Sequence, residues 1–203
     1  MKIIKPSYSI LYPTDWDEQI KRIEYAARNC YQSKSKGETE AFVRMLVDKN
    51  HGAMLEFGDM TVQFITDRGI ANQIVRHRLF SFAQESTIYC NYIKKENEIT
   101  VIEPSTYDSW SEHLKEQWLS SLYQIEEVYK QALDSTMTQQ ARAILPTALK
   151  TSLIVKGNFR QWLNFFKLRA YEKGNPDMHS LVKPLYEEVS ELCSCIFKGA
   201  VSE

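Results

Sequence analysis

The stretch Arg76–Tyr89, RHRLFSFAQESTIY, sets the strongest limit on what this chain can fold into. Two arginines flank His77, and bulky apolar residues, among them Phe80 and Phe82, follow at once. An arginine that is drawn toward a core needs an anion beside it, because its guanidinium stays charged at physiological pH. Two interpretations of these residues have equal weight: a buried ion pair with a carboxylate, or a binding site for a phosphate.

The amino-acid composition indicates an ordinary globular chain. Its 203 residues suit one domain with a sizeable core, or one large subunit of an oligomer. The formal net charge of -1 gives no overall attraction to nucleic acid or to a membrane surface, so an anion site must be a local cluster. A nucleic-acid-binding module built on Arg76 and Arg78 is disfavoured for the same reason. No run of about 18 apolar residues occurs, and the start of the chain has too short an apolar core for a signal peptide, so we expect a cytoplasmic protein.

The cysteines predict no metal site. Cys30 and Cys90 are isolated in the sequence, and one residue separates Cys193 from Cys195, where a zinc knuckle has two. We expect these thiols to be reduced, as is usual inside cells.

Hydrophobic periodicity predicts an α+β fold, because strands and helices do not alternate as a doubly wound sheet requires. We expect a mostly antiparallel sheet of short strands flanked by helices, in a single domain over residues 1–203. Extended segments are predicted at 2–11, interrupted by Pro6, and at 60–66, 89–93, 98–102 and 149–156. Helices are predicted at 16–32, 38–49, 70–75, 107–135, 139–145, 159–170 and 178–197.

Capping residues support three of these helices. Thr14 or Asp15 can cap the helix at 16–32, Asp108 or Ser109 the helix at 107–135, and Asn158 the helix at 159–170. The long amphipathic helix at 107–135 is expected to serve as a scaffold or a subunit interface.

The chain contains neither G-x-G-x-x-G after a strand nor G-x4-G-K-[ST], so a bound dinucleotide would lack a glycine-rich cradle. Its phosphates would have to be held by side chains, and arginine suits that role because its planar fork matches phosphate oxygens. The available side chains are Arg76, His77, Arg78 and Arg160.

The signature around His77 resembles that of the flavin-dependent thymidylate synthases, R-H-R-x7-S, with Arg76, Arg78 and Ser86 at the matching positions. Three further blocks follow the family's order: AARNCY at 26–31, ARAILP at 141–146 and NFRQWLNFFKLRA at 158–170. A fifth segment, HGAMLEF at 51–57, is similar to a family element that carries a histidine and a glutamate. The resemblance extends from about residue 26 to residue 197.

This resemblance implies an enzyme that moves a one-carbon unit from methylenetetrahydrofolate to C5 of dUMP and reduces it to a methyl group. FAD would carry the hydride, NADPH would supply it, and a homotetramer would share active sites between subunits. The residues that the resemblance places at the cofactor are Arg76, His77, Arg78, Cys30, Glu56, Asn158, Arg160 and Asn164. The residues that it places at the nucleotide are Gln73, Gln84, Glu85, Ser86, Arg142 and Arg169.

Two of these residues are the candidates for the chemistry itself. Arg169 would donate hydrogen bonds to a pyrimidine carbonyl and so favour the polarised ring. Ser86 is assigned to substrate binding, because no histidine–carboxylate relay that could activate a serine nucleophile stands beside it in the sequence.

The chain departs from the family pattern at three positions. Ile88 replaces an arginine that helps to grip the nucleotide's phosphate in relatives, while Phe57 and Asn175 stand where relatives often have histidine. Three explanations of Ile88 stay open: the substrate is another pyrimidine nucleotide, another cation substitutes, or the chain is a weakened enzyme. The candidate substitutes are Lys94, Lys95 and Arg142. We expect intact flavin binding with reduced nucleotide affinity. The alternative function is a flavin- or nucleotide-binding homologue that lacks synthase activity.

Overall fold

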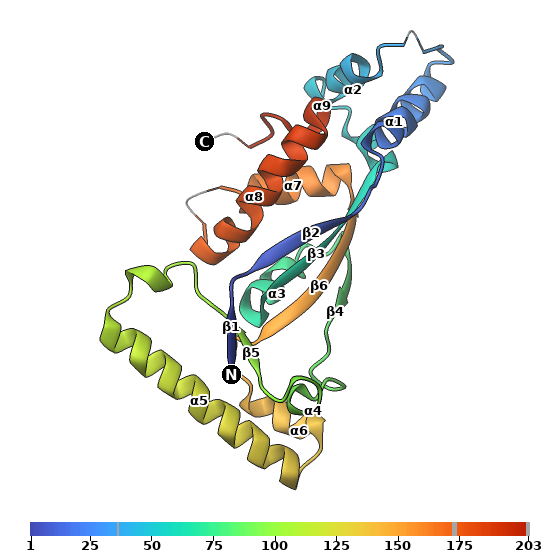
Figure 1. The fold of residues 1–203 in the computed structure, drawn as a ribbon. Helices are drawn as coiled ribbons and strands as arrows, with labels where there is room; N and C mark the ends of the chain where they lie inside the picture. The colour runs from blue at the N-terminus through green and yellow to red at the C-terminus, as the bar shows by residue number, and fades with distance from the viewer. Residues whose placement is uncertain (36, 172–173, 202–203) are drawn as a thin grey trace. The chain divides into compact units, whose positions relative to one another are not determined.

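The computed structural model describes residues 1–35, 37–171 and 174–201, with the backbone alone at 95 and 96. Figure 1 shows the order of its elements. The strands are β1 (Lys2–Ile4), β2 (Ser7–Tyr12), β3 (Asp59–Asp67), β4 (Ser81–Gln84), β5 (Thr100–Ile102) and β6 (Lys150–Asn158). The helices are α1 (Trp16–Cys30), α2 (Thr39–Asp48), α3 (Arg68–Ile74), α4 (Tyr92–Glu96), α5 (Glu112–Ser135), α6 (Thr138–Ala141), α7 (Phe159–Arg169), α8 (Pro176–Leu192) and α9 (Ser194–Phe197). Short 3-10 helices lie at Gly52–Phe57 (η1), Tyr107–Ser109 (η2) and Arg142–Ile144 (η3).

The expected α+β fold is confirmed. A four-stranded antiparallel sheet has the order β2-β3-β6-β4, and β1 pairs with β5 in parallel. Along β6, the buried residues Thr151, Leu153 and Val155 alternate with more accessible ones, as the sequence pattern predicts.

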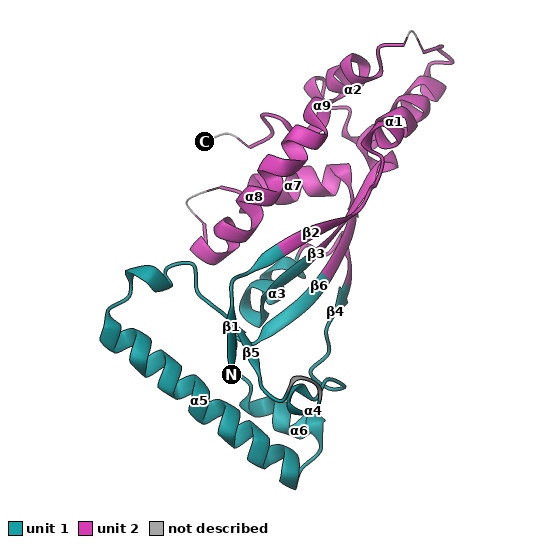
Figure 2. Ribbon diagram, viewed as in Figure 1, with its two compact units in different colours: residues 1–7, 64–76, 83–153 teal, residues 8–63, 77–82, 154–203 magenta. Residues whose placement is uncertain are grey.

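The chain divides into two compact units, coloured in Figure 2. Unit 1 comprises residues 1–7, 64–76 and 83–153, and unit 2 comprises residues 8–63, 77–82 and 154–203. The division falls within β2, β3, β4 and β6, and also within the signature, between Arg76 and His77. That the whole chain is a single domain stays a prediction.

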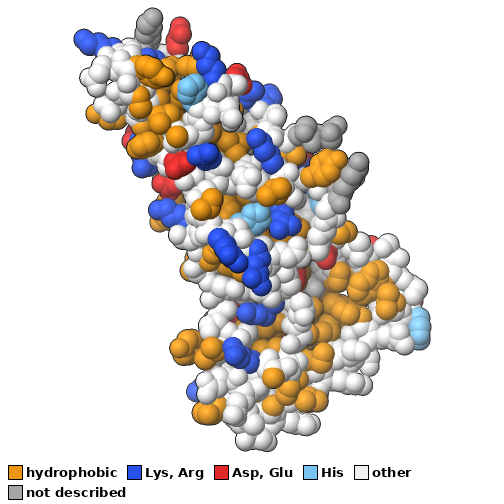
Figure 3. Space-filling view, turned by 180° about the vertical axis from the view of Figure 1, so that it is seen from behind, with side chains coloured by type: hydrophobic (Ala, Val, Ile, Leu, Met, Phe, Trp, Pro, Cys, Tyr) orange, Lys and Arg blue, Asp and Glu red, His pale blue; other side chains and the backbone are white. Residues whose placement is uncertain are grey.

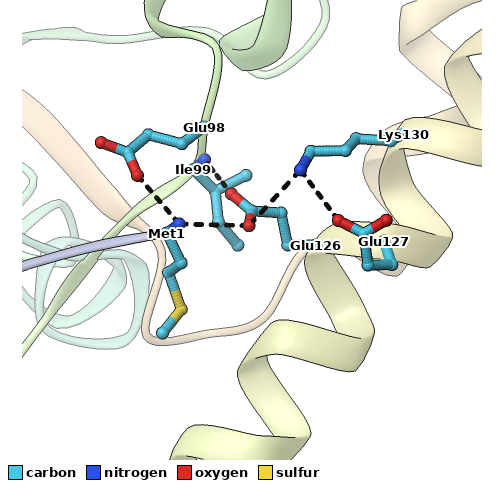
Figure 4. A network of polar contacts seen from close by, with 6 residues as sticks. All are labelled: Met1, Glu98, Ile99, Glu126, Glu127 and Lys130. Carbon is cyan, nitrogen blue, oxygen red and sulfur yellow. Dashed lines mark hydrogen bonds and ion pairs between the residues drawn. The ribbon is translucent and has the colours of Figure 1, made fainter.

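The core of unit 1 gathers around α5. Tyr92, Val101, Leu122 and Tyr129 belong to one buried cluster. Beside it, the buried carboxylate of Glu126 accepts hydrogen bonds from the backbone N–H of Ile99 at 2.8 Å and from the Met1 amine at 3.1 Å (Figure 4). These bonds fasten α5 to the segment that leads into β5.

Apolar side chains also reach the surface of the molecule (Figure 3). On α5, Leu114, Tyr123 and Val128 are exposed although the helix is amphipathic. The interface role that the sequence analysis expects for this helix stays a prediction.

The core of unit 2 is an aromatic cluster centred on α7. Trp162, Phe165 and Phe166 are fully buried, and Trp162 donates from its indole Nε1 to the backbone oxygen of Met60 at 3.0 Å. Asn158 caps the helix, as expected, and the side chain of Gln161 bonds back to the Asn158 N–H to complete a capping box. The cap on α1 is also confirmed, because Asp15 accepts from the Glu18 N–H.

Some expectations about local structure are wrong, and one strand was not predicted. The segment 89–93 is not extended, because Asn91 accepts from the Lys94 N–H and starts α4. A strand, β4, occupies Ser81–Gln84 within the signature because it can pair with β6, a long-range partner that local periodicity does not reveal.

Further corrections concern the bounds of three expected helices. α5 starts later than expected and is capped by Ser111, since the extended Trp110 separates it from η2 and packs its ring against Trp118. The expected helix at 139–145 divides into α6 and η3. The last helix begins at Pro176 and breaks at Cys193, between α8 and α9.

Candidate active site

His77, the centre of the signature, is joined to the end of α7. The Nε–H of Arg169 donates to Nε2 of His77 across 3.0 Å. The imidazole is half-buried, and its ring meets Phe165 edge-on with centroids 4.9 Å apart. The structure therefore brings together two residues that are 92 positions apart in the sequence.

The surroundings of His77 determine its protonation state. Burial, and then the charge of Arg169, lower the pKa of His77 below its usual value of 6.5. The imidazole is thus neutral at pH 7, and because Nε2 accepts a hydrogen bond, its proton lies on Nδ1. Arg169 uses its Nε–H in this bond, so its terminal NH2 groups can donate to another acceptor.

The loop after His77 is held by the start of α7. Gln161 donates from Nε2 to the backbone oxygen of Leu79 at 2.8 Å, and the Phe80 ring packs against Trp162 at 4.7 Å between centroids. Gly157 lies so close to Phe80 that an added Cβ atom would overlap the ring. Phe80 of the signature is therefore a core residue of unit 2.

Glu56 and Arg160, both assigned to the cofactor, form an ion pair. Arg160 Nη1 lies 2.7 Å from Glu56 Oε1, and both side chains are largely exposed. The Arg160 side chain also passes close to Gly52, where an added Cβ would lie 3.2 Å from its Nε. Glu56 thus orients the guanidinium on the surface of unit 2.

Most of the remaining residues assigned to the cofactor have exposed side chains. Arg78 and Asn164 are exposed, and no ion pair joins Arg76 or Arg78 to a carboxylate among the described residues. Asn158 uses its side-chain oxygen to cap α7, which leaves only its amide NH2 for a ligand. Charged donors without a carboxylate partner are suited to an anion brought from outside the chain.

Cys30 is exposed at the end of α1, on the wall of a cavity of about 1340 Å³ within unit 2. Arg28 and Phe57 line the same cavity. Arg28 is held by Glu24 at 2.6 Å and lies over the Phe42 ring, 4.0 Å from its centroid. Although burial alone would raise the pKa of Glu24, hydrogen bonds from Thr39, Arg28 and Ser35 keep it below its usual value.

Glu85 and Ser86, assigned to the nucleotide, lie in unit 1. Glu85 forms an ion pair with Lys150 at 2.8 Å, and its backbone oxygen accepts from Arg68 Nη1 at 3.4 Å. Ser86 accepts the backbone N–H of Ile88 at its Oγ, 3.2 Å away, in a tight turn. The structure therefore gathers Arg68 and Lys150, two cations that the sequence analysis missed, at the end of the signature.

A signal for Lys150 was present in the sequence, since it lies at the start of the predicted strand at 149–156, next to Leu149, but only strand pairing brings it to Glu85. The same pairing joins Gln84, which donates to the Thr151 hydroxyl at 3.5 Å. Gln73 is half-buried on α3, and Arg142 is exposed in η3. Lys94 is exposed on α4, and the side chain of Lys95 lies outside the described residues.

Within the described residues no group of three or more histidine, cysteine, aspartate or glutamate side chains could hold a metal ion. In the same part of the chain, the helices are too short or too polar to cross a membrane.

A family model described as "Thymidylate synthase complementing protein" matches residues 14–193. The chain therefore belongs to this family. It is 29% identical over 197 residues to a protein from Corynebacterium diphtheriae named "Flavin-dependent thymidylate synthase", with 86% of this chain and 76% of that protein covered. A protein of the same name from Mycolicibacterium gilvum is 30% identical over 192 residues, with 84% and 75% covered.

The fold is also similar to a crystal structure of PolB, a UMP/dUMP methylase from Streptomyces cacaoi, bound with 5-Br dUMP. The TM-score is 0.78 and the likeness covers 100% of both chains at 19% identity. At this identity the likeness supports the α+β architecture.

Proposed function

We propose that this chain is a flavin-dependent thymidylate synthase that converts dUMP to dTMP, with methylenetetrahydrofolate as one-carbon donor and NADPH as reductant. The observation that carries the proposal is the hydrogen bond from Arg169 to His77, because it unites the two most specific blocks of the family pattern at one place. Membership of the family supplies the reaction class.

In this proposal FAD, which carries hydride when bound, is held by side chains from the signature and from α7. Arg76, Arg78 and Arg160 supply positive charge for its diphosphate. Cys30 and Asn164 lie on exposed surfaces of unit 2 and contribute contacts at the ring, and Glu56 keeps Arg160 oriented through their ion pair at 2.7 Å. The donor set fits a diphosphate because it consists of guanidinium groups that are accessible to solvent.

In the same proposal the nucleotide is bound by Arg169 and by residues at the end of the signature. Arg169 keeps its terminal NH2 groups free of His77 and directs them to a pyrimidine carbonyl, where they favour negative charge on the ring. Ser86, Gln84 and Glu85 bind the nucleotide, with Gln73 and Arg142 as further contacts. Ser86 binds rather than attacks, since the turn uses its Oγ as an acceptor for the Ile88 N–H. The active enzyme is proposed to be a homotetramer with shared sites.

Ile88 favours a second candidate, in which the chain acts on another pyrimidine nucleotide or has lost synthase activity. Its side chain is 38% exposed and offers no charge where relatives carry arginine. In the first candidate, Lys150 and Arg68, which contact Glu85 three residues before Ile88, supply the missing charge, so dUMP is the first substrate to test. UMP is the natural second substrate, because PolB is named as a methylase of UMP and dUMP.

The deciding experiment is an anaerobic turnover with FAD, NADPH, methylenetetrahydrofolate and either dUMP or UMP, with products identified by mass. A product of dUMP that is heavier by one methyl group supports the synthase. Methylation of UMP alone transfers the proposal to the second candidate. NADPH oxidation with bound flavin but no methylated nucleotide rejects both methylase activities.

A further inference from the structure

Cys193 and Cys195 form a pair of buried thiols that the proposed reaction does not use. They lie at the break between α8 and α9, where Cys193 leaves the helical conformation with φ -141° and ψ 65°. The two Sγ atoms are 4.0 Å apart, and the residues are only 4% and 8% exposed. The break turns both side chains to one side, since an unbroken helix would point residues two apart in different directions.

A narrow cavity of about 100 Å³ within unit 2 reaches both thiols. Trp16, Asp17 and Glu40 are among the residues that line it. The pair is therefore buried from bulk solvent, and a disulfide as large as oxidised glutathione, which exceeds the volume of this cavity, reaches the sulfurs when this segment opens locally.

The two thiols also shift each other's pKa in opposite directions. Hydrogen bonding with Cys193 lowers the pKa of Cys195, although burial and the nearby Glu40 oppose this, and Arg44 contributes to the lowering. The same hydrogen bond, together with burial, raises the pKa of Cys193. Each cysteine thus changes how readily the other loses its proton, which matters for thiol–disulfide exchange because the thiolate is the attacking form.

A metal site does not explain the pair. Structural zinc takes four ligands, and no third histidine, cysteine or carboxylate completes a cluster with these thiols among the described residues. Two adjacent thiols without further ligands retain the chemistry of a dithiol: formation of a disulfide and chelation of trivalent arsenic.

We propose that Cys193 and Cys195 are a reversible dithiol site, oxidised to an intrachain disulfide by a small disulfide such as oxidised glutathione. Cys195 gives its proton to solvent, and its thiolate attacks one sulfur of the oxidant, which forms a mixed disulfide and releases one thiolate that takes up a proton from solvent. The sulfur of Cys193 then displaces the second thiolate, and its proton passes to a released thiolate. In sum, two protein thiols and one small disulfide give one protein disulfide and two small thiols.

The two cysteines lie next to α9, which contributes Phe197 to the core of unit 2. α9 packs against α2 and α8, and Phe197 at its end stacks edge-on with Phe159 and Phe166 of α7 at 5.3 and 5.8 Å. A bond between the two sulfurs must bring them about 2 Å closer, to the roughly 2.05 Å of a disulfide, so oxidation repositions the start of α9.

The test uses the full chain with Cys30 and Cys90 replaced by serine, which leaves only the proposed pair. The protein is equilibrated in glutathione buffers of increasing oxidised fraction, quenched with acid, alkylated and weighed intact. We expect the loss of two alkylation sites together, in the monomer, with a single midpoint, and full recovery with dithiothreitol. Peptide mapping should join Cys193 to Cys195. The wild-type chain, mapped in the same way, should show the same bond.

Two variants sharpen the result. With Cys193→Ser the remaining thiol should stop at the mixed disulfide with glutathione, and phenylarsine oxide should bind at least 100-fold more weakly than to the intact pair. Cys195→Ser should lose arsenical binding equally and react with glutathione more slowly. The proposal is overturned if both thiols remain alkylatable in the most oxidising buffer, or if the product is a mixed disulfide or a dimer in the chain with both cysteines.

Discussion

Arg169, the last residue of α7, donates from Nε to Nε2 of His77 across 3.0 Å. The bond requires a neutral imidazole, and the lowered pKa of His77 supplies one. A histidine between two arginines would be expected to bind an anion, but in the structure His77 instead orients a third arginine.

Replacing His77 with phenylalanine should preserve the packing against Phe165 but remove the acceptor for Arg169. If the proposed role of Arg169 is right, kcat should fall about 10- to 100-fold, since losing an oriented donor costs about 1.4 to 2.7 kcal/mol in the transition state. Flavin content is measured alongside, because His77 is also assigned to the cofactor, and kcat is compared at full FAD occupancy. Steady-state kinetics with dUMP tests this, and His113→Phe on the exposed side of α5 is the matched control. Unchanged kcat in the His77 variant would contradict the positioning role.

The stability of the protein should depend on pH through the same histidine. The folded state lowers the pKa of His77. The contribution of this histidine to the free energy of unfolding is therefore fully present at pH values above its pKa in the unfolded chain, about 6.5. The same contribution is lost as the pH falls from about 6.5 through the pKa that His77 has in the folded protein. Urea unfolding at several pH values should show a smaller drop in His77→Phe than in the wild type. Parallel pH profiles for the two proteins would exclude His77 as the source.

Introducing an arginine at position 88 should increase nucleotide affinity. A restored charge-assisted hydrogen bond is worth about 1.5 to 3 kcal/mol, or about one to two orders of magnitude in Kd for dUMP. Lys150→Met should weaken binding if Lys150 now supplies the charge near Glu85, 2.8 Å away. Calorimetry on both variants tests the two statements separately. Lys156→Met on the same strand is the control and should leave Kd unchanged.

Gly157→Ala should destabilise the protein, because the new methyl group would overlap the Phe80 ring. The cost should be about 1 to 3 kcal/mol, the usual range for overpacking a core. Gly174→Ala is the matched control, since its Cβ would meet nothing closer than 3.6 Å. Thermal unfolding of the two variants should separate them clearly, and equal Tm values would show that the signature loop tolerates displacement.

Glu126→Gln should destabilise unit 1 more than Glu127→Gln does. Glu126 is 3% exposed and binds the Ile99 N–H, whereas Glu127 lies at the surface beside Lys130 (Figure 4). Losing the charged acceptor should cost about 1.5 to 3 kcal/mol in the free energy of unfolding, as measured in urea. Equal costs for the two variants would show that the buried carboxylate is not needed.

The pKa of Glu126 gives this residue a pH dependence of the same sign as that of His77. Burial raises this pKa, but the Ile99 N–H, the Met1 amine and Lys130 together keep it below the usual 4.5. Its stabilisation is therefore present above the unfolded pKa and is lost as the pH falls through the folded one. The difference in the free energy of unfolding between the wild type and Glu126→Gln should vanish at pH values below the folded pKa of Glu126.

Much of the fold was predictable because the information was local. The caps Asp15 and Asn158 and the alternating strand that becomes β6 depend on residues three or four positions apart at most, and all three are confirmed. The wrong prediction at 89–93 has a local cause, the cap that Asn91 supplies to α4, but two other differences arise from contacts that the local pattern does not contain. Strand β4 exists through its pairing with β6, and the start of α5 is set by the packing of Trp110, so neither boundary is written in local periodicity.

The sequence by itself determined the family, through motifs whose residue types and spacing are visible without a structure. It also determined the α+β class, because hydrophobic periodicity reflects which face of each element is buried. Only the tertiary structure decided how the motif residues are used: that His77 is neutral and holds Arg169, that Lys150 and Arg68 reach Glu85, and that two thiols face each other at the end of α8. The physical reason is that hydrogen bonds, ion pairs and pKa shifts depend on distances of a few ångströms between residues far apart in the chain, which spacing along the sequence does not specify.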